Sequence, residues 1–205
     1  MMLKGMTVRY LLQDTYRVKK GDTILIHAAA GGLGLILCQW AKHLGATVIG
    51  TVSSKQKADL TRAHGCDYPI IYTKQNFVDR VKRITKGSGV PVVYDSIGKV
   101  TFEGSLDCLQ KRGLLVSFGN ASGPVGPFAP GILTQKGSLY VTRPSLFDYI
   151  ATRKELEASA RDLIHLVKTG VVKIKINQAY PLKDAAKAHR DLENRRTTGS
   201  TVLLT

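Results

Sequence analysis

The residues best suited to ligand chemistry lie between Thr23 and Gly34, in the stretch TILIHAAAGGLG. An apolar, β-branched run gives way there to small residues, and a helical pattern over Leu35–Leu44 follows at once. Because glycine has no Cβ, Gly31 and Gly32 allow backbone N–H groups to approach a pyrophosphate closely. The positive N-terminal end of the following helix attracts the same anion. The stretch therefore predicts the strand, turn and helix that open a dinucleotide-binding βαβ unit.

The glycine spacing departs from the usual G-x-G-x-x-G pattern. In that frame the chain has Ala29, Gly31 and Gly34, with Gly32 as an additional glycine. A plain strand–helix turn without a ligand is the alternative interpretation, since glycine-rich turns also end ordinary strands. The context favours binding, because a second strand at residues 47–52 arrives at the right distance along the chain.

The residues after this second strand favour a phosphorylated cofactor. An NAD site usually carries Asp or Glu there to bind the ribose 2′-OH. Residues 51–57 read TVSSKQK and contain no carboxylate, so Ser53, Ser54 and Lys57 suit the donors and charge that a 2′-phosphate needs. Ser53 could also simply cap the next helix, with the lysines solvated, and the two interpretations are compatible. The sequence favours NADPH over NADH.

Composition fits an α/β protein without a membrane anchor. The chain has 205 residues, 43% of them hydrophobic, which allows one large domain or one domain plus a fragment of another. No apolar run approaches the ~18–20 residues of a membrane span, and the N-terminus is too polar for a secretory signal. Cys38, Cys66 and Cys108 are dispersed without metal-ligand spacing. We therefore expect a cytoplasmic protein with reduced thiols and no metal site.

The net charge of +15, from 30 Lys and Arg against 15 Asp and Glu, would attract polyanions. Nucleic acid is therefore a possible partner. However, the basic residues are dispersed, no run of five or more occurs, and no aromatic–basic RNA motif is present. We favour a basic, solvated surface with a phosphate pocket.

Strands and helices alternate along the chain, which predicts right-handed crossovers and a parallel, doubly wound sheet. Ligands then bind beyond the carboxyl ends of the strands. The tail breaks this alternation, because a strand after the sixth has no obvious place in the sheet and belongs to another domain. The predicted strands are 47–52, 67–72, 90–95, 113–118, 139–142, 173–180 and 200–205, and the predicted helices are 3–17, 33–44, 55–63, 76–85, 101–109, 155–169 and 183–194.

Five motifs in order, HAAAGGLGLILCQWAK, VVYDSIG, SLDCLQKRGLLVSFGNASG, GSLYVTRPSL and YPLKDAAKAH, resemble the NADPH-dependent quinone oxidoreductases. These form the zinc-independent, zeta-crystallin-like branch of the medium-chain dehydrogenase/reductase superfamily, and the resemblance covers essentially the whole chain. It implies hydride transfer from NADPH to a quinone or a similar conjugated carbonyl such as an enal. It also implies a Rossmann domain with its entering helix over residues 1–170. Residues 171–205 would complete a barrel-like catalytic domain that the chain lacks, so we expect a truncated form with reduced activity.

The resemblance also implies cofactor contacts, by position. Gly32 and Leu33 would lie under the pyrophosphate, beside Gly31, and Tyr72 would join the 2′-phosphate pocket. The remaining contacts would come from Tyr10 and Thr7 of the entering helix, from Ile97 at the nicotinamide ribose, from the loop Gly119, Asn120, Ala121 and Ser122, from Pro144, Ser145 and Leu146 near the nicotinamide, and from Arg195.

We identify no catalytic residue, because hydride transfer needs neither an acid–base dyad nor a metal. His27 is expected to pack or hydrogen-bond beside the glycine turn, and Asp95 to accept hydrogen bonds from loop N–H groups. The short apolar strand Ser138–Thr142 is expected at the outer edge of the sheet, where it would pair with a second copy in a homodimer. Two alternatives remain: a catalytically inactive nucleotide-binding module, and an RNA-binding protein that uses the positive charge.

Overall fold

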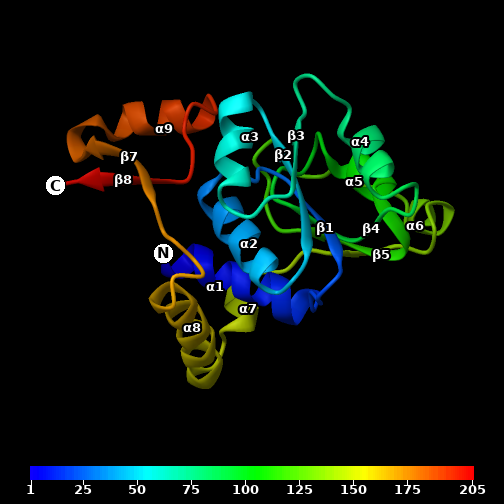
Figure 1. The fold of residues 1–205 in the computed structure, drawn as a ribbon, viewed down its shortest axis with the longest axis horizontal. Helices are drawn as coiled ribbons and strands as arrows, with labels where there is room; N and C mark the ends of the chain where they lie inside the picture. Colours follow the sequence, from blue (N-terminus) through cyan, green and yellow to red (C-terminus); the bar gives the residue numbers. More distant parts are fainter.

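Six parallel strands form the central sheet of the computed structural model, which describes residues 1–205 (Figure 1). Their order is β3-β2-β1-β4-β5-β6. The order reverses between β1 and β4, and the carboxyl ends of these two strands flank the crevice where open α/β sheets bind ligands. This confirms the predicted doubly wound Rossmann sheet. The strands are β1 (Thr23–Ile26), β2 (Thr47–Val52), β3 (Tyr68–Ile71), β4 (Val90–Asp95), β5 (Leu109–Ser117) and β6 (Tyr140–Thr142).

Helices cover both faces of the sheet, because neighbouring side chains of a strand point to opposite faces. In β1, Ile24 packs into a core shared with α1, α2 and α8, whereas Leu25 packs into a second core with α4 and α5. The helices are α1 (Met2–Tyr10), α2 (Gly32–His43), α3 (Lys55–Arg62), α4 (Phe77–Ile84), α5 (Phe102–Asp107) and α8 (Arg153–Lys168). None of the helices is long and apolar enough to cross a membrane.

The C-terminal residues form a separate βαβ unit beside α2 and α3 (Figure 1). Strands β7 (Ile176–Pro181) and β8 (Ser200–Leu204) pair in parallel, with α9 (Ala185–Glu193) as the crossover after a short 3₁₀ turn at Leu182–Asp184. These strands have no place in the main sheet, as the sequence predicts. One contact ties the unit to the glycine turn, because Gly199 N donates to Ala30 O at 2.8 Å.

Several predicted boundaries were wrong. Where the sequence predicts one helix over residues 3–17, the α-helix ends at Tyr10 and a π-helical turn follows to Thr15. The helix predicted to reach Leu109 ends at Asp107, because Leu109 pairs with Val90 and opens β5. The strand predicted from residue 173 begins at residue 176. Two short helices, α6 (Gly131–Gln135) and α7 (Leu146–Tyr149), were not predicted.

Candidate cofactor-binding site

The glycine turn links β1 to α2 and leads into the half-buried N-terminus of that helix. Gly31 is the N-cap residue, with an extended backbone at φ −74° and ψ 167°. No side chain caps this terminus, and its first turn carries no acidic residue. The first-turn N–H groups therefore keep their partial positive charge for a bound anion. Gly31, Gly32 and Leu33, the residues predicted at the pyrophosphate, lie at this helix terminus.

Packing explains the unusual glycine pattern. The turn's left-handed residue is Ala28 (φ 52°), so no positive φ is needed at Ala29, where the usual pattern has its first glycine. At Gly34 an added Cβ would lie 2.5 Å from Ala28 O and 2.6 Å from Ala29 O. The third glycine is therefore required for close contact between the turn and α2.

Three predicted cofactor contacts, Lys57, Tyr72 and Arg195, meet at the end of β2. Lys57 Nζ donates to Arg195 O at 2.6 Å, and Arg195 Nη1 donates to the Tyr72 hydroxyl at 3.2 Å. Ser54 caps α3 and accepts from Lys57 N at 3.3 Å, so the cap is Ser54 rather than Ser53. Ser53 lies beside this group, where its carbonyl accepts from the Thr73 hydroxyl at 3.0 Å.

The electrostatics of this group favour an anion. Partial burial, and then the charge of Arg195, lower the pKa of Lys57. Two cations held together repel each other, and a phosphate placed between them would offset that repulsion. Arg195 also has a left-handed backbone (φ 58°), a conformation that non-glycine residues adopt rarely. The residues present therefore fit a 2′-phosphate.

Asp95, at the end of β4, organises the next loop. Its Oδ1 accepts from the main-chain N–H groups of Ile97 at 2.7 Å and Gly98 at 3.1 Å. Its Oδ2 accepts from the hydroxyls of Thr101 at 2.7 Å and Ser105 at 3.0 Å. Asp95 is thus the structural acceptor that the sequence predicts, and it fixes the position of Ile97.

The loop Gly119–Ser122 packs directly on this segment. Ser122 Oγ donates to Ile97 O at 2.9 Å, and Ser122 N donates to the same oxygen at 2.8 Å. Ala121 N donates to Ser96 O at 3.2 Å. Asn120 and Ala121 are exposed on the loop. The structure therefore brings Ile97 and the loop predicted to pass along the cofactor together, with Ser122 joining them.

The predicted nicotinamide end comprises Pro144, Ser145 and Leu146, and the helix α7 that follows contacts Tyr10, the residue predicted to line the cleft. The ring of Tyr10 stacks on Tyr149 with centroids 4.3 Å apart and an interplanar angle of 12°. Burial and the neighbouring Tyr149 raise the pKa of Tyr10 to about 12, although Arg143 opposes the shift. Tyr10 and Leu146 are buried in the core, whereas Pro144 and Ser145 lie at the surface between β6 and α7.

Sequence reasoning missed two contributors to this end. Arg143 Nη1 donates to Ser117 O at 2.8 Å and so ties the ends of β5 and β6 together. Tyr149 belongs to α7, and its hydroxyl accepts from Thr15 Oγ1 at 3.2 Å. The tyrosine in the sequence FDY gave no local signal of a stacking role. Tyr149 therefore holds α7 against α1 and the π-helical turn.

Nothing in the fold offers a metal site. No group of three or more His, Cys, Asp or Glu side chains could hold a metal ion. The cysteines at positions 38, 66 and 108 are free and buried. The donor set therefore does not fit a zinc ion.

Comparison with known proteins agrees with this geometry. Residues 32–164 match the family described as zinc-binding dehydrogenase. A quinone oxidoreductase of Pseudomonas aeruginosa is 58% identical over 203 residues, which is 99% of this chain and 62% of that protein. A 2-haloacrylate reductase of Burkholderia is 50% identical, over 100% of this chain and 62% of the relative.

Solved structures give the same match. The crystal structure of Escherichia coli quinone oxidoreductase complexed with NADPH superposes with a TM-score of 0.97 at 55% identity, covering 99% of this chain and 63% of that one. A mycobacterial structure complexed with NADPH gives a TM-score of 0.97 at 48% identity, covering 100% of this chain and 63% of that chain. The chain thus spans just over three-fifths of the length of these relatives.

Proposed function

Since the chain belongs to the zinc-binding dehydrogenase family and is similar to quinone oxidoreductases, we propose that it binds NADPH for the reduction of a quinone or another conjugated carbonyl. The observation that carries this proposal is the cluster of Lys57, Tyr72 and Arg195 at the end of β2. Two cations and a phenol at this place supply donors for a 2′-phosphate, and no carboxylate stands between residues 51 and 57 to bind an unphosphorylated ribose.

The residues of the chain would bind and orient the cofactor, which supplies the hydride when bound. The first turn of α2 would hold the pyrophosphate through main-chain N–H groups. The loop anchored by Asp95, together with Ser122, would position the nicotinamide ribose. Tyr10 and the segment 144–146 would shape the nicotinamide end and exclude water from it. No residue of the chain is assigned a proton-transfer step.

The substrate class follows from the relatives. Quinones and 2-haloacrylate both carry a carbon–carbon double bond conjugated to a carbonyl group, and the similar proteins are named for reducing them. A hydride acceptor of this type requires orientation more than an acid–base residue. We therefore propose that the substrate is a quinone or an enal, and that zinc has no part in its reduction.

Residues 1–170 would form the NADPH-binding domain, and residues 171–205 would belong to the barrel-like catalytic domain of the family. The apolar side chains of Ile176, Leu182 and Leu192 support this division, since they are 58%, 52% and 58% exposed on the C-terminal unit. Such exposure is typical of a surface that meets another domain.

We further propose a homodimer through β6, the outermost strand on its side of the sheet. The strand pairs only with β5, and Tyr140 on it is 60% exposed. Pairing of two such edges about a two-fold axis satisfies both sets of backbone groups. The buried, unpaired thiols fit the reducing cytoplasm, where we place the protein.

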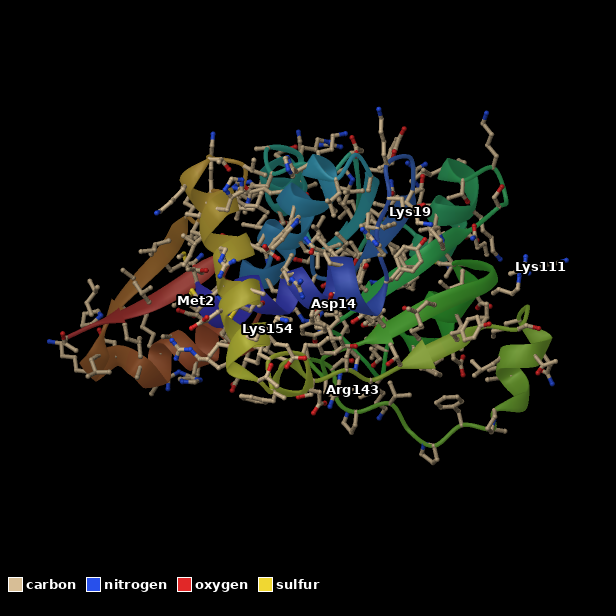
Figure 2. All side chains as sticks on the ribbon, turned by 90° about the horizontal axis from the view of Figure 1, so that it is seen from below. Met2, Asp14, Lys19, Lys111, Arg143 and Lys154 are labelled. Carbon is tan, nitrogen blue, oxygen red and sulfur yellow. The ribbon has the colours of Figure 1, made fainter.

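No specific observation favours nucleic-acid binding. Lys19, Lys111, Arg143 and Lys154 lie on separate parts of the molecule (Figure 2). A dispersed charge of this kind attracts polyanions weakly and without a defined groove.

The proposal is tested by titrating the chain with NADPH and then adding a small quinone. Saturable binding together with quinone-dependent NADPH oxidation would support the enzyme. Binding without oxidation would instead favour an inactive nucleotide-binding module.

A further inference from the structure

One buried chain of hydrogen bonds runs beneath three cofactor loops. His27 Nδ1 lies 2.9 Å from Thr51 Oγ1, and His27 Nε2 lies 3.0 Å from Ser105 Oγ. Ser105 Oγ in turn donates to Asp95 Oδ2 at 3.0 Å. Thr51 precedes the phosphate pocket, His27 precedes the glycine turn, and Asp95 holds the Ile97 loop. These hydrogen bonds therefore connect the adenosine side of the site to the nicotinamide side.

The direction of every proton in this chain follows from its last member. A carboxylate only accepts, so the single hydroxyl hydrogen of Ser105 points to Asp95. Ser105 Oγ must then accept from His27 Nε2–H. Burial lowers the pKa of His27 and so favours the neutral ring, with Nδ1 unprotonated. Nδ1 accepts from the Thr51 hydroxyl. His27 is thus a neutral imidazole with its proton on Nε2, and every polar atom of the chain is satisfied.

Burial makes the loss of any of these hydrogen bonds energetically costly. Thr51, His27, Ser105 and Asp95 are 3%, 2%, 0% and 1% exposed. Hydrogen bonds are stronger in such surroundings, and an unpaired polar group is correspondingly costly. The ring of Phe77 meets the imidazole edge-on, with centroids 5.0 Å apart and an interplanar angle of 89°, which fixes the ring plane. Movement of Thr51 or Asp95 must therefore disturb the other end of the chain.

We propose that His27 is a positioning residue that makes the adenosine and nicotinamide halves of the cofactor site bind cooperatively. This inference rests on the proposed function, namely that the site holds NADPH. Occupation of the phosphate pocket fixes the end of β2 at Thr51. The hydrogen-bonded chain transmits that order to Asp95, and so to the N–H groups of Ile97 and Gly98.

The test divides the cofactor into two probes, 2′,5′-ADP and reduced nicotinamide mononucleotide, and measures the affinity of each with and without the other. In the wild-type chain each fragment should tighten the other about fivefold or more, within the usual range of coupling between sites. His27→Leu should remove this coupling. His27→Gln should retain part of it, because an amide keeps one donor and one acceptor.

A less disruptive variant is Thr51→Val, which removes the hydrogen bond between Thr51 and His27. Thr61→Val is its matched control. Thr61 is also fully buried, but its hydroxyl donates within α3, to Ala58 O at 2.9 Å. Thr51→Val should abolish coupling between the fragments, whereas Thr61→Val should leave it intact. Equal effects of the two variants would overturn the inference, since a general loss of stability would explain them.

A second measurement needs no ligand. In the wild-type chain, nitrogen NMR should show His27 as the Nε2–H tautomer. Thr51→Val should accelerate hydrogen exchange at the amides of Ile97 and Gly98, which donate to Asp95 at the other end of this series of hydrogen bonds. A proton on Nδ1, or unchanged exchange, would overturn the inference. Failure of the wild-type chain to bind NADPH would contradict the proposed function, whereas binding of the two fragments with independent affinities would contradict this inference alone.

Discussion

Lys57 Nζ donates to the main-chain carbonyl of Arg195 at 2.6 Å, across 138 positions of the sequence. This contact makes the segment between α9 and β8 a wall of the candidate phosphate site. Arg195 Nη1 donates in turn to the hydroxyl of Tyr72, whose main-chain N–H donates to Val52 O at the end of β2, and residues 51–57 carry no carboxylate. The choice between NADPH and NADH therefore depends on both ends of the chain.

Lys57→Ala should weaken NADPH binding by about 1.5–3 kcal/mol, the range for a hydrogen bond to a charged group. NADH binding should change little, since NADH has no 2′-phosphate. Lys55→Ala is the matched control, because Lys55 is exposed in the same turn. Isothermal titration with both cofactors measures the effect, and equal losses for NADPH and NADH would disprove the phosphate assignment.

Gly34→Ala should destabilise the chain by about 1–3 kcal/mol, as overpacking does. The added Cβ would lie 2.5 Å from Ala28 O, and this backbone oxygen cannot move without breaking the turn. Gly126→Ala is the control, since an added Cβ there meets nothing within 4 Å. Urea unfolding compares the two variants. A Gly34→Ala chain as stable as the control would refute the packing argument.

The free energy of unfolding should decrease on acidification because of His27. Burial lowers the pKa of His27 in the folded chain, and the charge of Asp95 only partly opposes this shift. Below about pH 6.5, the ordinary histidine pKa, the unfolded chain therefore binds more protons at this position than the folded chain. The contribution of neutral His27 is complete above that pH and is lost progressively below it.

His27→Gln should show a shallower decline, because glutamine does not titrate. Urea unfolding of both proteins between about pH 5 and 8 measures the difference. Every other ionisable group is the same in the two proteins, so the comparison isolates His27. Parallel stability curves would mean that His27 has no lowered pKa.

Tyr140→Lys should convert the proposed dimer into monomers, because it places like charges on both sides of the two-fold axis at β6. Val141→Pro should act in the same direction through the loss of a backbone N–H group. Tyr68→Lys is the matched control, since Tyr68 is 45% exposed on β3, the opposite edge strand. Sedimentation velocity distinguishes the species. A wild-type chain that remains monomeric at high concentration would end the dimer proposal.

The sheet and the glycine turn could be predicted from sequence because their signals are local. An apolar run, a small-residue turn and a helical period occupy adjacent positions in Thr23–Leu44, so their order alone indicates a βαβ unit. The short helices α6 and α7 have five and four residues, too few to establish a helical period. The start of β5 at Leu109 depends on its pairing with Val90, which overrides the local helical pattern.

The candidate site could be predicted only in part, because local sequence signals identify only some of its residues. Ser54 and Lys57 follow a strand directly, and their chemistry is evident from their position. The stacking of Tyr10 on Tyr149, in contrast, and the bond from His27 to Ser105 join residues far apart in the sequence. Their geometry arises from tertiary packing, which no short motif records. The resemblance placed Arg195 near the cofactor, but its carbonyl contact with Lys57 appears only in the fold.

The most direct test of the account is a fluorescence titration of the wild-type chain with NADPH and, separately, with NADH. We expect saturable binding of NADPH, and NADH should bind at least about tenfold more weakly, because each 1.4 kcal/mol lost at the phosphate pocket is a factor of ten. Absence of saturable NADPH binding, or an equal affinity for NADH, would contradict the central claim that the Lys57, Tyr72 and Arg195 cluster binds a 2′-phosphate.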